Sequence, residues 1–221
     1  MPLTDLWQPS AAGSGAEAGP GTGLGDASFT ELRTARLVLR RFQEQDAATL
    51  AAYRSEPDVA RYQGWDTPFT QEQAATFIAA LHDAHPGTPG EWFQIAVCSA
   101  EDGRHLGDVA VHTDATDPGL ARVGVTFAPE AQGHGYATEA LTALLDHLFG
   151  VRGVRRVVAD CDVRNTASAA LLERVGFRHE ALHRAASWWK GEWTDEHVYA
   201  LLAHEWPERR RADRADLSES G

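Results

Sequence analysis

Hydrophobic residues near the middle of the chain recur first at every second position and then at the spacing of a helix. Val123, Val125 and Phe127 alternate as one face of a β-strand, and Pro129 ends the ladder because it has no N–H to donate. The residues that follow at helical spacing are Ala137, Ala140, Leu141, Leu144, Leu145 and Leu148. Gly150 stands where a helix C-terminal cap is expected. The pattern therefore predicts a strand, a tight loop and an amphipathic helix in succession.

Similar patterns divide the remainder of the chain into strands and helices. Alternating segments predict strands at 32–42, 92–97, 106–112 and 154–161, with a last pair of strands around Lys190. Helices are predicted after Asp46 as an N-cap, after a capping box of Thr70 and Gln73, and over 166–175 up to Gly176 as a C-cap. This order predicts an α/β fold, a mixed sheet with helices on both faces.

Composition separates one globular domain from two terminal segments. The hydrophobic content of 43% is ordinary for a globular protein, and we expect one domain over residues 29–207. Residues 1–28 are rich in Gly, Ala, Ser and Pro, and residues 208–221 are charged and rich in Arg, so both are expected to be flexible tails. The first residues lack the basic start and apolar core of a secretory signal, and no run reaches the length of a membrane span.

The net charge of −12 narrows the expected partners. Nucleic acids require a basic footprint, so we expect no nucleic-acid partner. An acidic surface suits a cationic acceptor such as an amine, although solvation of the surface is the more common cause of such a charge. Cys98 and Cys161 show no metal-ligand spacing. We therefore expect no metal site, and a cytoplasmic protein with reduced cysteines. A homodimer is also a possible assembly.

The loop between the central strand and helix carries the candidate chemistry. It contains two glycines, Gly133 and Gly135, which allow the backbone to fold closely around a ligand. The first N–H groups of the helix that follows have no partner within the helix, and the helix dipole favours an anion there. A phosphate-binding turn is one interpretation, and a purely structural turn is the other. The loop matches neither a dinucleotide fingerprint nor a Walker loop.

Two motifs in order resemble the GNAT N-acetyltransferases, in particular the RimJ/RimL-like branch. Gln132, Gly135 and Ala137 occupy the positions of the family's Q/R-x-x-G-x-G/A loop, and Asn165 and Ser168 match its N-x-x-S segment. The resemblance implies a mostly antiparallel sheet with a splayed central strand pair, and acetyl-CoA as cosubstrate with its pyrophosphate on the loop. The residues that it implies as cofactor contacts are Val125, Phe127, Gln132, Gly133, His134, Gly135, Tyr136, Ala137, Thr138, Asn165 and Ser168.

Candidate catalytic residues follow from what acyl transfer requires. Ser168 matches the family's serine and is a candidate to protonate the leaving thiolate, although it could simply cap its helix together with Asn165. Carboxylates that the family often carries are replaced here by Arg122 and Ser187. Asp108 and His112 are alternative bases because they share one strand face, although an exposed or hydrogen-bonded polar face is the more common reason for such residues.

The expected function is transfer of an acetyl group to a primary amine of a small molecule or a protein N-terminus, by direct attack in a ternary complex. Trp65, Trp188 and Glu192 fall in segments that line the acceptor side in this family, where aromatic walls and a carboxylate would suit a cation. Ordinary core or hairpin packing is the competing interpretation of these residues. Two other functions stay open: a CoA-binding module without turnover, and transfer of a larger acyl group.

Overall fold

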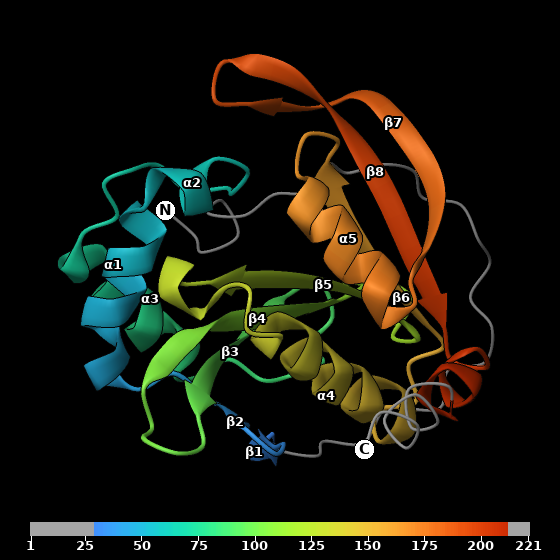
Figure 1. Ribbon diagram of the computed structural model, residues 1–221, viewed down its shortest axis with the longest axis horizontal. Coiled ribbons are helices and arrows are strands. Elements are labelled where there is room, and N and C mark those ends of the chain that lie inside the picture. Colours follow the sequence, from blue (N-terminus) through green and yellow to red (C-terminus); the bar gives the residue numbers. More distant parts are fainter. Residues whose placement is uncertain (1–28, 212–221) are drawn as a thin grey trace.

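The computed structural model describes residues 29–211, which form an eight-stranded sheet flanked by helices (Figure 1). The strands are β1 (Glu31–Arg33), β2 (Leu37–Arg40), β3 (Trp92–Ser99), β4 (His105–Thr113), β5 (Leu120–Phe127), β6 (Arg156–Asp162), β7 (Arg178–Trp189) and β8 (Glu192–Leu202). The helices are η2 (Glu44–Asp46), α1 (Ala47–Ser55), α2 (Pro57–Ala60), α3 (Gln71–Leu81), η3 (Pro129–Ala131), α4 (Tyr136–Gly150) and α5 (Thr166–Val175). The tail expected at 1–28, and residues 212–221 of the tail expected at 208–221, lie outside the described residues.

The sheet contains one parallel pair, and this pair opens. The strand order is β1-β2-β3-β4-β5-β6-β8-β7, and neighbouring strands are antiparallel except for β5 and β6. β5 pairs with β4 along its whole length as far as Phe127, but it pairs with β6 only from Leu120 to Arg122. Beyond Arg122 the edge of β5 that faces β6 therefore has no ladder partner there. The splayed central pair implied by the resemblance is confirmed.

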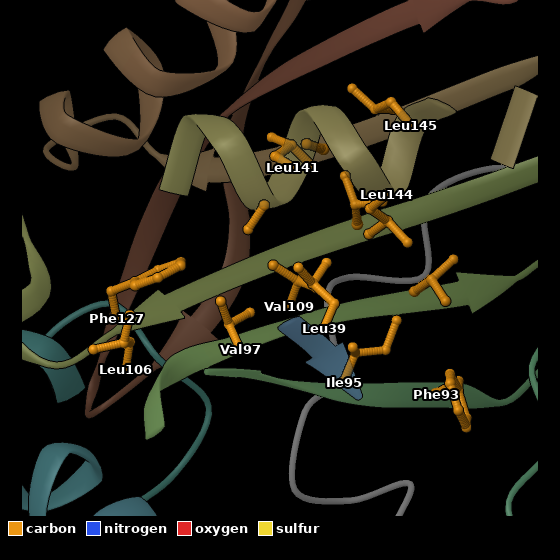
Figure 2. Close-up of a cluster of buried hydrophobic side chains, with 14 of the residues drawn as sticks. Leu39, Phe93, Ile95, Val97, Leu106, Val109, Phe127, Leu141, Leu144 and Leu145 are labelled. Atoms are coloured by element: carbon orange, nitrogen blue, oxygen red, sulfur yellow. The ribbon is translucent and has the colours of Figure 1, made fainter. Parts of the chain in front are cut away.

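Helices cover both faces of this sheet. Adjacent residues of β4 show the division, because neighbouring side chains in a strand point to opposite faces. Val109 belongs to a cluster of buried aliphatic and aromatic side chains from β2 to β5 that lies beneath α4 (Figure 2). Asp108, on the other face, accepts a hydrogen bond from the Tyr53 hydroxyl of α1. The predicted α/β fold with helices on both faces is therefore confirmed.

Local sequence signals fixed several element ends as predicted. The Thr70 hydroxyl accepts a bond from Gln73 N–H while the Gln73 side chain accepts one from Thr70 N–H, which completes the capping box of α3. Asn165 caps α5 by accepting from Ser168 N–H at 3.1 Å. Gly176 ends that helix in the left-handed region at φ 111°.

Three local predictions differ from the structure. The strand expected at 32–42 is two short strands, because Thr34 turns the chain: its hydroxyl accepts from Leu37 N–H at 2.9 Å. Asp46 precedes α1 but makes no cap bond, since its carboxylate is held by the Arg40 guanidinium at 2.7 and 2.9 Å. Residues 206–211 are helical rather than a tail from 208 onward, and Arg210 pairs there with Asp146 at 3.0 Å.

Candidate active site

A cavity of about 470 Å³ occupies the gap between the parted strands β5 and β6. Its volume falls in the range of small-molecule sites, about 300–1,000 Å³. Residues from β5, β6, the glycine loop, the start of α4, α5, the α2 region and the β7–β8 hairpin line it. The strands β5 and β6, the glycine loop and the start of α5, all predicted from the sequence, therefore meet at this cavity.

The lining residues divide between the two faces of the sheet. Cys161 of β6 lies on the face that α5 covers, since its thiol hydrogen-bonds with Ser168 of that helix. We call this face the helix side; it also carries Val125, Phe127, Gly135, Ala137, Thr138 and Leu171. Asp160 and Asp162 alternate with Cys161 and so point the other way. We call that face the hairpin side; it also carries Glu196, Trp189, Thr194 and Tyr62.

The glycine loop at the start of α4 has the geometry of an anion site. Gly133 and Gly135 both have φ of 78°, in the left-handed region that favours glycine. Gly135 is the N-cap of α4 and provides no side-chain bond to the first turn, so no residue of this loop occupies the helix N-terminus. A β-carbon at Gly133 would meet no atom within 4 Å, which leaves the loop open for a ligand to approach. These features fit a pyrophosphate bound to the N–H groups of the loop and helix.

Arg36, which directly precedes β2, contacts this loop from the side. Its guanidinium donates to the carbonyl oxygen of His134 at 3.0 Å and to Glu139 of α4 at 2.7 Å. The same group lies 4.8 Å from the centre of the Tyr136 ring. Glu139 also accepts from the Thr34 hydroxyl at 2.5 Å. The sequence analysis missed Arg36, because its contacts join segments that are far apart along the chain.

Asn165 and Ser168 line the helix side of the cavity beside Cys161. Asn165 caps α5, which confirms the capping alternative without excluding contact with a ligand. Burial raises the pKa of the Cys161 thiol to about 11, although the Ser168 hydroxyl opposes this by hydrogen-bonding to the sulfur. The thiol therefore stays protonated near neutral pH and is a poor nucleophile.

Asp160 is the one carboxylate of β6 that faces the hairpin side next to the point where the strands part. Its Oδ1 accepts from Nη1 of Arg122 on β5 at 2.5 Å. Burial raises the pKa of Asp160 above its ordinary value, and the neighbouring Arg122 charge opposes that increase. A largely buried carboxylate with a raised pKa in a cavity has the properties of a general base. The sequence analysis missed it, because nothing in the local pattern around Asp160 marks it.

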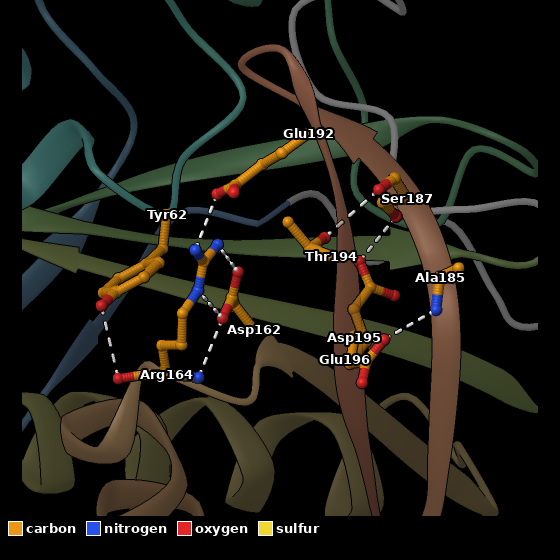
Figure 3. Close-up of polar contacts among 9 residues, drawn as sticks. All are labelled: Tyr62, Asp162, Arg164, Ala185, Ser187, Glu192, Thr194, Asp195 and Glu196. Carbon is orange, nitrogen blue, oxygen red and sulfur yellow. Dashed lines mark hydrogen bonds and ion pairs between the residues drawn. The ribbon is translucent and has the colours of Figure 1, made fainter.

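Polar contacts close the hairpin side around Arg164 (Figure 3). Its guanidinium donates to Asp162 at 2.6 Å and to Glu192 at 2.7 Å, and its carbonyl oxygen accepts from the Tyr62 hydroxyl at 3.3 Å. The Ser187 hydroxyl donates to Glu196 at 2.6 Å. At the hairpin tip, Lys190 donates to the carbonyl oxygen of Ala60 at 2.5 Å. The β7–β8 hairpin is thus joined to the α2 region across this side of the cavity.

Asp108 and His112 share the hairpin-side face of the sheet, as predicted, but neither lines the cavity. Asp108 is buried under α1 between Tyr53 and Arg54, whose Nη2 lies 4.0 Å from its carboxylate. His112 pairs with Arg122, at the closed end of the strand gap, and its ring lies 5.2 Å from that of Trp92. Neither side chain lies against the cavity, so their role as bases stays a prediction that the geometry does not favour.

Three acceptor-side candidates are also placed elsewhere. Trp65 is buried in the core, where its Nε1 donates to the carbonyl oxygen of Arg54 at 2.8 Å. Trp188 is 60% exposed and packs edge-on against Trp193, and Glu192 is paired with Arg164. The neighbouring Trp189 does line the cavity, and its buried Nε1 has no hydrogen-bond partner within residues 29–211.

Most of the expected cofactor contacts line the cavity. They are Val125, Phe127, Gln132, Gly135, Ala137, Thr138, Asn165 and Ser168. Gly133, His134 and Tyr136 belong to the same loop and helix start but are not among the lining residues. Within the part of the chain that the structure describes, no cluster of three or more potential metal ligands occurs. In that same part, no helix is both long and apolar enough to cross a membrane.

Comparisons with known proteins agree with this arrangement. Residues 36–178 match the family model described as acetyltransferase (GNAT) domain. The chain is 30% identical to the uncharacterized N-acetyltransferase p20 of Bacillus licheniformis, over 79% of this chain and 97% of that protein. It is 27% identical to the uncharacterized N-acetyltransferase YnaD of Bacillus subtilis, over 79% of this chain and 98% of that protein.

Solved structures show the same fold. A GNAT-family acetyltransferase from Bacillus anthracis superimposes with a TM-score of 0.69 at 26% identity, covering 79% of this chain and 99% of that chain. The family model spans both the glycine loop and the strand pair that forms the cavity. The chain therefore belongs to the GNAT acetyltransferase family and is an acyltransferase.

Proposed function

We propose that the protein uses acetyl-CoA to acetylate a primary amine of a small molecule or a protein N-terminus, by direct attack in a ternary complex. One observation carries this proposal: a single cavity runs through the gap between β5 and β6 and is lined from both faces of the sheet. Such a gap allows a donor and an acceptor to approach one reaction point from opposite sides. Holding two reactants in line supplies much of the rate of a group transfer.

The helix side of the cavity suits the donor. Acetyl-CoA would supply an activated thioester, with its pyrophosphate held by the N–H groups around Gly135. The backbone of β5 beyond Arg122 has no ladder partner on β6, so its N–H groups near Val125 are available to a carbonyl oxygen. The Ser168 hydroxyl lies on this side and can donate a proton to a leaving thiolate. The glycine loop from Gln132 to Ala137 and the segment from Asn165 to Ser168 support membership of the RimJ/RimL-like branch.

The hairpin side suits a cationic amine. Four carboxylates line the cavity, from Asp58, Asp160, Asp162 and Glu196. Asp160 is the best placed to accept the amine proton, because it lies beside the gap and its raised pKa brings it nearer to that of a working base. Trp189 offers an indole N–H to an acceptor oxygen. Two arginines, Arg61 and Arg174, also line the cavity, and the excess of carboxylates over arginines favours a cationic amine over an anionic acceptor.

Direct attack is favoured over an acyl-cysteine intermediate. Cys161 is the cysteine of the cavity, and its pKa of about 11 keeps it protonated near neutral pH. Both Cys98 and Cys161 are buried and free, which suits a reducing compartment such as the cytoplasm.

The test is release of free thiol from acetyl-CoA by purified full-length protein with a panel of primary amines and N-terminal peptides. We expect amine-dependent release, and a loss of kcat by a factor of roughly 10²–10⁴ in Asp160→Asn with CoA affinity retained. Tight CoA binding with no release for any amine would instead support a CoA-binding module without turnover. Release only from longer acyl-CoA donors would replace the acetyl group in the proposal.

A further inference from the structure

Arg122 occupies a special place in the sheet. It is the last residue of β5 that pairs with β6, where its partner is Val158. Paired residues of neighbouring strands point to the same face, and Asp160 lies two residues beyond Val158 on that face. The Arg122 side chain therefore lies at the closed end of the gap, next to Asp160, the candidate base.

Arg122 contacts only one of the two carboxylate oxygens of Asp160. Nη1 of Arg122 donates to Oδ1 of Asp160 at 2.5 Å. Within residues 29–211 no other side chain bonds to this carboxylate, so Oδ2 remains for a ligand. The side chain of Asp160 is 16% exposed and that of Arg122 is 32% exposed. Arg122 is not among the residues that line the cavity, so it acts on a ligand only through Asp160.

We propose that Arg122 is the positioning residue for Asp160: it grips one carboxylate oxygen and presents the other to the amine. The inference rests on the proposed N-acetyltransferase function. In the reaction Asp160 takes one proton from the attacking amine nitrogen as that nitrogen bonds to the acetyl carbon and the thiolate leaves. The proton then passes from Asp160 to solvent. Arg122 neither gains nor loses a covalent bond in this reaction. It keeps the Asp160 carboxylate ionised and oriented toward the amine.

Few other charges act on Asp160. From β7, the neighbouring His183 opposes the rise in the pKa of Asp160, and from β8 the strand partner of Asp160 is the apolar Val198. On β6 itself, Asp162 lies two residues away on the same face, opposite Glu196 of β8, and is paired with Arg164, whereas the Cys161 thiol points to the other face. On β4, His112 faces Arg122 rather than Asp160. Burial and the Arg122 charge are therefore the two main and opposite influences on this carboxyl.

The test compares Arg122→Gln, which removes the charge, with Arg122→Lys, which keeps it. An opposite charge in contact lowers a carboxyl pKa by roughly 1–3 units, so Arg122→Gln should move the acidic limb of kcat/KM upward by about one pH unit or more. Arg122→Lys should leave the limb near its wild-type position. A matched control is Arg155→Gln, which breaks the exposed pair of Arg155 with Asp117 and should not move the limb. CoA affinity should be unchanged in all three variants.

A second measurement does not depend on turnover. Titration of the Asp160 carboxyl by ¹³C NMR, with the resonance assigned through Asp160→Asn, should show the same upward shift in Arg122→Gln. An unshifted carboxyl in Arg122→Gln would overturn the inference, whether or not the protein is active. If Arg122→Gln does not fold, Arg122→Met provides the same test with a similar side-chain length. Absence of thiol release by the wild type would overturn the proposed function alone, because the titration still decides the pairing.

Discussion

Asp108→Asn should destabilise the protein without affecting the chemical step. The carboxylate of Asp108 is 3% exposed, accepts from the Tyr53 hydroxyl and lies 4.0 Å from the Arg54 guanidinium. Arg54 is itself 4% exposed, and its charge lies 4.4 Å from the Trp65 ring centre and 4.5 Å from that of Phe77. The substitution keeps an oxygen for the Tyr53 hydroxyl but removes the charge opposite a buried cation.

Removing one partner of a buried ion pair costs roughly 3–5 kcal/mol. The pair here is at the limit of contact and the aromatic rings also stabilise the cation, so we expect the lower end, about 3 kcal/mol. At about 2–4 °C per kcal/mol for a domain of this size, the melting temperature should fall by about 6–12 °C. Thermal melts of the wild type and Asp108→Asn measure this, with exposed Asp102→Asn as the control.

The kcat of Asp108→Asn distinguishes a structural role of Asp108 from a catalytic one. Amine-dependent kcat at a temperature well below the melting point should stay within about a factor of two of wild type, because Asp108 does not line the cavity. An unchanged melting temperature together with a fall in kcat of about 10²-fold or more would show that Asp108 is the base after all. That outcome would also remove Asp160 from its proposed role.

Three further predictions concern the loop and the acid limit of stability. Gly135→Val should weaken CoA binding strongly, because φ of 78° is strained for a branched residue and the side chain would crowd the anion site; unchanged affinity by calorimetry would refute it. Arg36→Ala should weaken CoA binding by loosening the His134 carbonyl and Glu139, whereas the exposed neighbour Arg33→Ala should not; equal affinities would argue against the clamp. Burial opposes but does not prevent lowered pKa values for Asp46, through its hydrogen bond to Arg40, and for Glu139, through hydrogen bonds to Thr34 and Arg36. The stability that these carboxylates contribute is present above their unfolded pKa values, near 3.8 and 4.5, and is lost as pH falls through the lower folded values. Urea unfolding between pH 7 and 3 should show this loss, reduced in Asp46→Asn.

Elements that depend on local sequence were predicted well. Three helix ends depend only on residues within one helical turn, so the sequence pattern alone predicts them. They are the capping box at Thr70, the cap at Asn165 and the left-handed Gly176. The glycine loop is local in the same sense. These signals sufficed for the order of most strands and helices and for the helix side of the cavity.

Features that depend on distant contacts were not predictable in the same way. Asp160 gains its properties from Arg122, which is far away in sequence, and from the parting of two strands. A register shift in the β3–β4 pair places His105 and Asp108 both against Tyr53, although strict alternation would put them on opposite faces. Trp65 looked like a loop aromatic, and only the approach of Arg54 and Phe77 makes it part of the core.

The contact between the hairpin tip and the α2 region gives the protein a built-in chemical reporter. Lys190 is the single lysine of the sequence, and its ammonium is engaged with the carbonyl oxygen of Ala60, where burial lowers its pKa. An amine-reactive reagent can therefore modify only this side chain and the chain's α-amino group. The rate of labelling at Lys190 therefore measures how often the hairpin tip separates from Ala60.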